Sequence, residues 1–218
     1  MNLNRNLSRV DETLQILADA HAILENDHFV YISGDHGSGW IDKDTIFVNL
    51  ERLRRLGVLL AELVADLRVD YLCGPATGGL IVAQWTAAVL KLPAVFAEHD
   101  GNLATDDLRG HFVLRRGYDR LVKGKRVLVV DDVVNSGHSI RQTAEAVRRA
   151  EGEVVAAAVL MHRGNVDADG MGVPEFRYLL EYDIPEWPAA SCPLCKAGMP
   201  INTRFAHGQD FLDAQARG

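Results

Sequence analysis

Apolar positions along the chain first recur with helical spacing and then gather into continuous runs. Between Leu7 and Leu24 they recur at steps of three and four residues, so we expect an amphipathic helix over much of residues 7–25. Residues 28–48, HFVYISGDHGSGWIDKDTIFV, predict two short strands around a glycine-rich turn. Residues 50–67 return to helical spacing, with leucines gathered on one face.

From residue 69 onward, apolar strands alternate with helices. The strand patterns are VDYLCG, PAVFAE, RVLVVDD and VVAAAVLMHR, and Gly152 is the expected stop of the last helix between them. Continuous apolar strands that alternate with helices predict a parallel sheet covered on both faces, and hence an α/β fold. Ligands bind beyond the carboxyl ends of the strands in such sheets, which directs attention to residues 74–79, 131–139 and 162–165.

The pattern also suggests how the chain is organised. We expect one domain over residues 1–182, in which residues 1 to about 50 form a small N-terminal hood. Residues 183–218 contain four prolines and little periodicity, so we expect an irregular C-terminal appendage there.

Composition and charge narrow the classes of protein. Of the 218 residues, 48% are apolar and 24% are charged, as in ordinary globular proteins. The net charge of −7 argues against extended nucleic-acid binding. No apolar run has the length of a membrane span, and the polar N-terminus lacks the apolar region of a signal peptide. We therefore expect a cytoplasmic protein without nucleic-acid or membrane partners, and the three cysteines do not suggest a disulfide framework.

The stretch RVLVVDDVVNSGHSI, residues 126–140, carries the most specific chemistry. A valine-rich strand leads into Asp131 and Asp132, although an unpaired buried carboxylate is costly. One reading makes one acid a helix cap and leaves the other exposed. In the alternative, the small polar residues 136–139 place backbone N–H groups at a helix N-terminus, where they bind a phosphate. The adjacent carboxylates would then meet ribose hydroxyls or a hard cation.

This stretch resembles the phosphoribosyl-pyrophosphate (PRPP) signature of the type I phosphoribosyltransferases: four apolar residues, two acids, two apolar residues, and small polar positions around a glycine. The matching residues are Asp131, Asp132, Val133, Val134, Asn135, Ser136, Gly137, His138 and Ser139. Asn135 replaces the usual threonine, and His138 replaces a small residue. The resemblance implies a type I phosphoribosyltransferase-like parallel sheet flanked by helices.

The resemblance also implies roles for these residues. Asp131 and Asp132 would hold the 2- and 3-hydroxyls of the PRPP ribose, and residues 135–139 would hold its 5-phosphate. Magnesium bound through PRPP near the two acids would neutralise the leaving pyrophosphate. The acids would also stabilise the positive charge that develops on the ribose ring.

Two further loops fit the same family. The turn after the first strand of the sheet, where the family grips the pyrophosphate through backbone amides, contains Pro75, Ala76, Thr77, Gly78 and Gly79. The family's mobile basic loop, often supplied by the partner subunit of a homodimer, corresponds to residues 98–125. Just after Phe96 and Ala97, where the family has basic residues, this chain has acids. The available substitutes, of which we assign Arg115 and Arg116 to catalysis, are Arg109, Arg115, Arg116 and Lys123.

The N-terminal segment is similar to that of orotate phosphoribosyltransferases. Ser33, Gly34 and Trp40 match in kind, and Arg163 matches an arginine that contacts the base, whereas Ile32 replaces a lysine of that family. We therefore expect Ser33, Gly34 and Arg163 to bind the base, and orotate is the favoured acceptor. Another pyrimidine or a purine is the alternative. A PRPP-binding regulator without turnover, or a hydrolase that uses the acid pair, are the competing classes.

The appendage contains CPLC, Cys192 to Cys195, which has the spacing of a zinc knuckle. A closed structural zinc site needs two further ligands, for which His207, His162 or a second subunit are the candidates. The alternative is two ordinary thiols in a turn.

Overall fold

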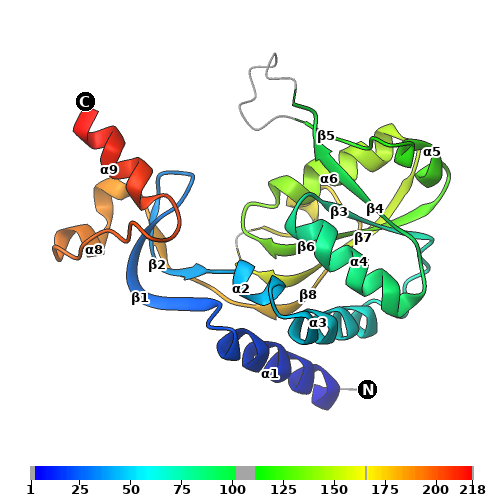
Figure 1. Ribbon diagram of the computed structural model, residues 1–218, viewed down its shortest axis with the longest axis horizontal. Coiled ribbons are helices and arrows are strands. Elements are labelled where there is room, and N and C mark those ends of the chain that lie inside the picture. The colour runs from blue at the N-terminus through cyan, green and yellow to red at the C-terminus, as the bar shows by residue number, and fades with distance from the viewer. Residues whose placement is uncertain (1–2, 102–110, 165, 218) are drawn as a thin grey trace. The chain divides into compact units, whose positions relative to one another are not determined.

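The computed structural model describes residues 3–101, 111–164 and 166–217 (Figure 1). The chain divides into two compact units, each made of two separate stretches of sequence. The first contains Met1–Thr13 and Asn49–Tyr182, and the second contains Leu14–Val48 and Asp183–Gly218. The hood and the C-terminal appendage, which we expected to be separate parts, thus contribute to the same unit.

The first unit holds a six-stranded sheet in the order β5-β4-β3-β6-β7-β8. Its strands are β3 (Tyr71–Pro75), β4 (Ala94–His99), β5 (Phe112–Val113), β6 (Arg126–Val134), β7 (Glu153–His162) and β8 (Phe176–Glu181). Neighbouring strands are parallel except at the edge, where β5 runs antiparallel to β4. The predicted α/β fold with a mostly parallel sheet is confirmed.

Helices cover both faces of this sheet (Figure 1). They are α1 (Leu3–Asp19, shared with the second unit), α3 (Leu50–Leu63), α4 (Gly78–Leu90), α5 (Tyr118–Val122), α6 (His138–Arg149) and α7 (Ala168–Met171). From β3 the chain passes through α4 to β4 on one side, and from β6 through α6 to β7 on the other. Right-handed crossovers in opposite directions place α4 and α6 on opposite faces. The sheet therefore has its topological switch point between β3 and β6, where ligands bind in open α/β sheets.

The core explains why the strands lack apolar-polar alternation. Residues 127–132 of β6 are all buried, as are residues 156–163 at the end of β7. A strand between two helical layers is shielded on both faces, so both sets of side chains are apolar.

Three expected boundaries are wrong. Strand β6 continues beyond the two acids to Val134 instead of ending at Asp132. The first helix ends at Asp19, and residues 23–30 form a strand. Gly152 is not the left-handed residue after α6: Glu151 takes that conformation, with φ of 59°. Packing accounts for the glycine at position 152, because a Cβ there would lie 2.8 Å from the side chain of Val147.

The second unit contains a three-stranded antiparallel sheet in the order β1-β2-β9. Its elements are β1 (Ile23–Val30), β2 (His36–Ile41), α2 (Asp44–Phe47), β9 (Glu186–Trp187), the 3-10 helix η1 (Ala189–Ser191), α8 (Pro193–Lys196) and α9 (Gly208–Arg217). The two predicted hood strands are present, but residues 44–47 form a short helix instead of extending the second. The appendage is not irregular, since it supplies a strand and three short helical segments.

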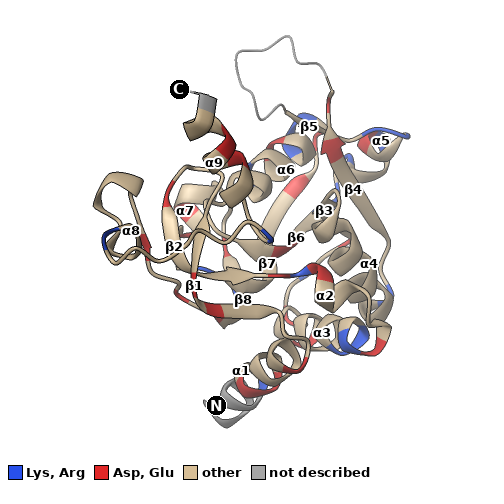
Figure 2. Cartoon of the chain, turned by 60° about the vertical axis from the view of Figure 1, so that its left-hand side comes forward, with Lys and Arg blue, Asp and Glu red and all other residues tan. Residues whose placement is uncertain are grey.

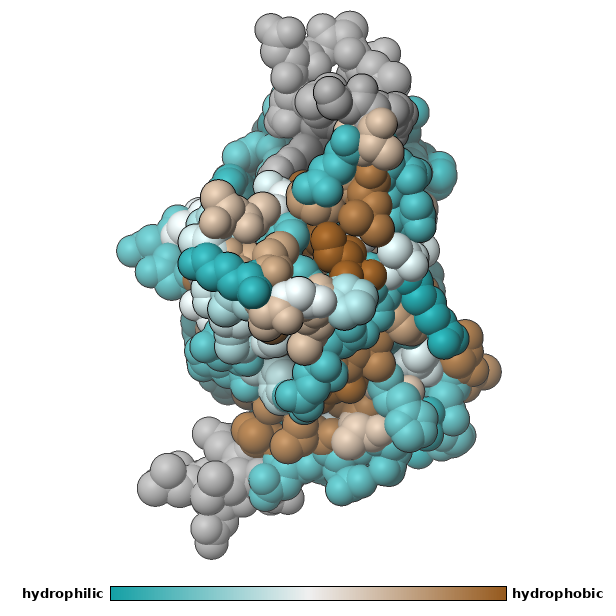
Figure 3. Space-filling view, turned by 90° about the vertical axis from the view of Figure 1, so that its left-hand side faces the viewer, coloured by the Kyte–Doolittle hydropathy of each residue, from teal (hydrophilic) through white to brown (hydrophobic). Residues whose placement is uncertain are grey.

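The surface is mixed in character. On the face that Figure 3 displays, apolar residues are interspersed with hydrophilic ones. Ile32, 77% exposed, and Val48, 84% exposed, are among the large apolar side chains that face solvent. Among the described residues, none of the helices has both the length and the apolar character needed to span a bilayer.

Candidate active site

The turn after β3 contacts the carboxylate of Asp131 on β6. A Cβ atom built on Gly79 would lie 2.7 Å from Oδ1 of Asp131 and 2.5 Å from the ring of Pro75. Gly74, at the end of β3, is packed against the backbone of Gly79 with equally little room. The peptide bond between Ala76 and Thr77 is cis. The structure thus brings the predicted pyrophosphate turn and the predicted ribose acid together at the switch point.

The two acids are buried and held by their own backbone. Asp131 is 6% exposed and Asp132 is 2% exposed. Oδ1 of Asp131 accepts a hydrogen bond from the amide of Asp132 at 2.9 Å, and Oδ1 of Asp132 accepts one from the amide of Val133 at 2.5 Å. These bonds orient both carboxylates and add favourable partners for their charged forms.

Residues 135–139 wrap around the N-terminus of α6. Together with Asp131 and the end of β6, they line a hollow of about 150 Å³. Gly137 precedes the helix with φ of 70°, a conformation that favours glycine. A Cβ there would also clash with the side chain of Met171. The helix N-terminus presents unsatisfied N–H groups and a partial positive charge, so the hollow is suited to an anion.

Arg163 lies at the same edge of the sheet. It follows β7, and its amide donates to the carbonyl oxygen of Val134 at 2.9 Å. Its side chain is buried, with only 6% exposed. The predicted base-binding arginine therefore sits beside the strand that carries the two acids.

Arg115 and Arg116 lie beside the first residues of the expected basic loop. Nη2 of Arg115 donates to Oδ1 of Asp100 at 2.6 Å, and Nη2 of Arg116 donates to Oε2 of Glu98 at 3.0 Å. Arg116 also lies over the ring of Phe96, 5.2 Å from its centre. Acidic and basic residues accordingly gather around β4, β5 and α5 in Figure 2. The acids that stand where the family has basic residues thus pair with the expected substitutes. Arg109 lies outside the described residues.

Ser33 and Gly34 form the turn between β1 and β2 in the second unit. Gly34 has φ of 87°, and its amide donates to the carbonyl oxygen of Tyr31 at 2.9 Å. Oγ of Ser33 donates to Oδ2 of Asp35 at 3.1 Å. Ile32 is largely exposed beside them. This turn belongs to the second unit, and Arg163 belongs to the first.

Comparison with known proteins identifies the family. A model of the phosphoribosyl transferase domain matches residues 42–170. Orotate phosphoribosyltransferase 2 of Mesorhizobium japonicum is 36% identical over 195 residues, which is 88% of this chain and 95% of the relative. The orotate phosphoribosyltransferase of Caulobacter vibrioides is 36% identical over 193 residues, with 88% and 93% covered. The chain belongs to the phosphoribosyltransferase family. It is therefore a transferase, and its similarity to the orotate phosphoribosyltransferases extends over most of its length.

Solved structures share the fold of this phosphoribosyltransferase. Orotate phosphoribosyltransferase from Aeropyrum pernix superimposes with a TM-score of 0.63 at 25% identity, covering 77% of this chain and 92% of that one. The Mycobacterium tuberculosis orotate phosphoribosyltransferase in complex with PRPP gives a TM-score of 0.59 at 22% identity, with 79% and 96% covered. The resemblance inferred from the signature at residues 131–139 is confirmed.

Sequence reasoning missed two histidines of a side-chain cluster in the second unit. His28 and His36 lie with Cys192 and Cys195, so neither His162 nor His207 joins the cysteine pair. His162 instead packs against the rings of Phe176 and Tyr178 in the first unit.

Proposed function

We propose that this chain transfers the phosphoribosyl group of PRPP to orotate, giving orotidine 5′-monophosphate and pyrophosphate, a step of pyrimidine biosynthesis. The contact between Gly79 and Asp131 carries the proposal, because it joins a pyrophosphate turn to a ribose carboxylate at one switch point. The curated relatives, named as orotate phosphoribosyltransferases, support orotate as the base.

The groups of PRPP are assigned to three parts of the site. The 5-phosphate enters the hollow at residues 135–139, where the N-terminus of α6 offers N–H donors. The ribose hydroxyls meet Asp131 and Asp132, and the pyrophosphate lies along residues 75–79. Held in this way, C1 of the ribose is presented to a nitrogen of the base, and positioning supplies much of the rate enhancement. The buried carboxylates stabilise the positive charge that develops on the ribose.

Magnesium is part of the proposal. The adjacent carboxylates of Asp131 and Asp132 offer the hard oxygen donors that Mg²⁺ prefers, beside a hollow suited to a phosphate. When bound, the ion neutralises charge on the pyrophosphate as it leaves.

The residues that we propose for the base are Ser33, Gly34 and Arg163. Arg163 contributes a cation for the orotate carboxylate, and the turn at Ser33 and Gly34 contributes backbone and hydroxyl groups. Ile32 cannot supply the positive charge that the resemblance places at that position. Arg163 is therefore the principal anion-binding group for the base, which favours an acidic base over a neutral purine.

A PRPP-binding regulator without turnover is the second candidate. The ion pairs of Arg115 and Arg116 with Asp100 and Glu98 favour it, because both arginines are engaged by acids instead of being held for pyrophosphate. These pairs are solvent-exposed, and exposed pairs are weak enough to be exchanged for a polyanionic substrate. We therefore retain the enzyme as the first proposal, with both arginines catalytic.

The deciding experiment is release of pyrophosphate from PRPP and magnesium, with and without orotate. The proposal expects release only with the base, together with consumption of orotate. A panel of other pyrimidines and purines distinguishes a changed acceptor. PRPP binding by calorimetry without release for any base would establish the regulator instead.

We further propose a cytoplasmic homodimer. The small number of cysteines supports the cytoplasmic location. The resemblance to a family whose basic loop often comes from a partner subunit supports the homodimer. The exposed apolar side chains of Val48 and Leu50 offer surface for such a partner. Sedimentation equilibrium of the full chain measures the oligomeric state.

A further inference from the structure

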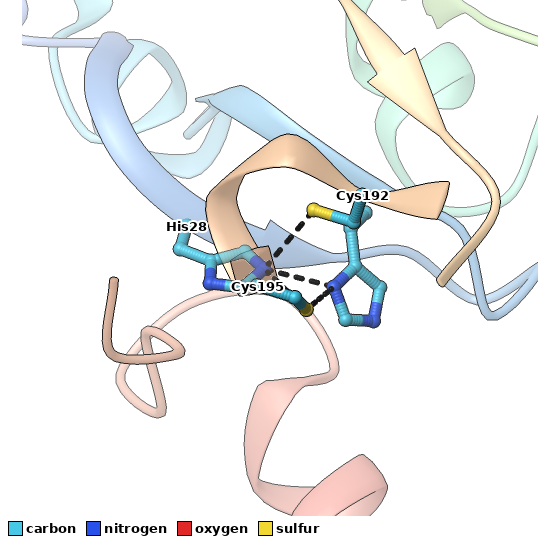
Figure 4. Close-up of side chains that lie close together, drawn as sticks. His28, Cys192 and Cys195 are labelled. Atoms are coloured by element: carbon cyan, nitrogen blue, oxygen red, sulfur yellow. Dashed lines mark hydrogen bonds between the residues drawn. The ribbon is translucent and has the colours of Figure 1, made fainter. Parts of the chain in front are cut away.

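A cluster of four metal-ligating side chains lies in the second unit. His28 on β1 and His36 on β2 lie close to two cysteines, Cys192 just before α8 and Cys195 within it. One ligand atom from each residue falls within 4.8 Å of all the others. Figure 4 shows the thiols of Cys192 and Cys195 turned toward the imidazole of His28. All four come from one compact unit, and residues assigned to PRPP are absent from the set.

The spacing of these atoms fits a tetrahedral ion. With Zn–N of about 2.05 Å and Zn–S of about 2.3 Å, a tetrahedron has N–S edges of about 3.6 Å and an N–N edge of about 3.3 Å. Nε2 of His28 lies 3.7 Å from both sulfurs, and Nδ1 of His36 lies 3.3 Å from Sγ of Cys195. The two nitrogens are 2.8 Å apart, so binding of an ion would increase their separation by about 0.5 Å.

The hydrogen bonds of His28 prepare it as a ligand. Its Nδ1 lies 2.8 Å from the carbonyl oxygen of Met199. A carbonyl oxygen only accepts, so Nδ1 carries the proton, and Nε2 turns its lone pair toward the two sulfurs. A ring N–H donated to a backbone carbonyl is the usual second contact of a metal-binding histidine, because it fixes the tautomer and the ring orientation.

The surroundings of His36 favour its neutral, metal-binding form. The side chain is fully buried, and its Nε2 has no hydrogen-bond partner in the described part of the chain. Burial without a partner at Nε2 disfavours the charged imidazolium, in which both ring nitrogens must donate.

A hydrogen-bonded histidine pair is the alternative reading of the cluster. Nδ1–H of His36 donating to Nε2 of His28 accounts for their 2.8 Å separation. It does not account for two thiols that converge on the same point from a separate segment of chain. A metal ion accounts for all four side chains at once.

We propose that His28, His36, Cys192 and Cys195 bind one zinc ion as a closed structural site. Two thiolates and two imidazoles in tetrahedral arrangement select zinc over the hard cations Mg²⁺ and Ca²⁺. Four protein ligands leave no open position for a substrate or a reactive water, so the ion is structural and not catalytic.

The ion fastens the C-terminal segment to the β1-β2 hairpin. Weaker contacts already join them: the amide of Asn202 donates to the carbonyl oxygen of His28 at 2.7 Å, and the amide of His207 donates to that of Val30 at 2.9 Å. Phe211 of α9 packs edge-on against the ring of His36, with centroids 5.0 Å apart. Because ligands from two distant stretches of sequence share the ion, its free energy of binding becomes free energy of folding of the second unit.

The first test is the metal content of the full chain, purified without chelator or added metal, by plasma mass spectrometry. One zinc per chain is expected. Cys192→Ser, Cys195→Ser and His28→Gln should each lower the content to below about one tenth of an ion. Cys73→Ala and His207→Gln are the matched controls, since these residues lie outside the cluster, and both should keep one ion. Controls that lose zinc equally, or ligand variants that keep it, would overturn the assignment.

Cobalt substitution tests the ligand set in the unaltered chain and does not depend on whether variants fold. The Co²⁺ protein should show the intense visible bands of a tetrahedral ion and the near-ultraviolet charge transfer of two thiolates. Weak octahedral bands, or a wild-type chain that neither contains zinc nor takes up Zn²⁺ or Co²⁺ when refolded with it, would refute the site. No substrate enters these measurements, so they stand independently of the proposed orotate transfer.

Discussion

Gly79 contacts Asp131 so closely that a single added methyl group would lie 2.7 Å from the carboxylate oxygen Oδ1. The contact joins two segments about fifty residues apart through neighbouring parallel strands. It also makes glycine at position 79 a requirement of the site and not only of the turn.

Gly79→Ala should impair the use of PRPP. The new methyl group must displace the turn or the Asp131 carboxylate, and a displacement of about 1 Å costs about 100-fold in activity. Initial rates at varied PRPP should show this as a lower kcat/KM. Gly198→Ala is the control, because Gly198 has φ of 68° but open space around it. That variant should lose stability through backbone strain without any change in KM for PRPP. Unchanged kinetics in Gly79→Ala would show that the contact with Asp131 does not matter for PRPP use.

Asp131→Asn and Asp132→Asn, made together, should nearly abolish turnover while the fold persists. The amides keep the shape and can still accept the backbone bonds, but the charge that stabilises the ribose cation is lost. We expect kcat to decrease by about 100-fold or more. Circular dichroism and thermal unfolding report the fold, and Asp169→Asn, an exposed acid in α7, is the matched control. Activity retained within a few-fold would place the ribose elsewhere.

Arg163→Ala should raise the KM for orotate much more than the KM for PRPP. Loss of one charge-assisted contact costs about 1.5–3 kcal/mol, or roughly 10- to 150-fold in binding. Arg126→Ala offers a comparison at the opposite end of β6, where the guanidinium pairs with Glu153 on the surface. Arg126→Ala should leave both constants unchanged. Equal effects of Arg163→Ala on the two substrates would remove Arg163 from the base pocket.

The ion pair between Arg177 and Asp66 should make stability depend on pH in the acid range. Hydrogen bonding to Arg177 lowers the pKa of the Asp66 carboxyl below its usual value. A lowered native pKa gives stability that is present above the unfolded value of about 3.9 and is lost as the pH falls through the native value. Asp66→Asn should therefore destabilise the protein at neutral pH by about 0.5–1 kcal/mol, since Asp66 is largely exposed. Urea unfolding at pH 7 and below pH 3 measures the difference, which should vanish at the lower pH.

The sequence predicted the central strands of the sheet and the position of the site, because both depend on short stretches of neighbouring residues. The strands that became β3, β6 and β7 are buried over most of both faces, so apolar residues predominate in each. Strand β4 is half-buried at alternate positions, but its residues 94–97 are also apolar. The signature at residues 131–139 located the site because it combines a buried strand, two acids and a helix start within a short interval. Strand β5, with two residues, is too short to produce such a pattern.

Features that depend on distant segments were not predicted. The extension of β6 to Val134 follows from pairing with β7, where Val134 lies opposite His162. His28 and His36 gave a weak signal: His36 pairs with Val30, which makes the histidines diagonal neighbours on one face of a hairpin. That signal becomes specific only when Cys192, 164 residues later, is known to lie against the same face.

The second unit is assembled from the two ends of the chain, and this sets an order for its biosynthesis. A ribosome that adds about 5–20 residues per second needs roughly 8–30 s to pass from His28 to Cys192. During that interval both histidines of the hairpin have been synthesised and neither cysteine has. A chain released before Cys192 lacks two of the four proposed ligands. Closure around the proposed metal thus marks a polypeptide that has been translated beyond Cys195.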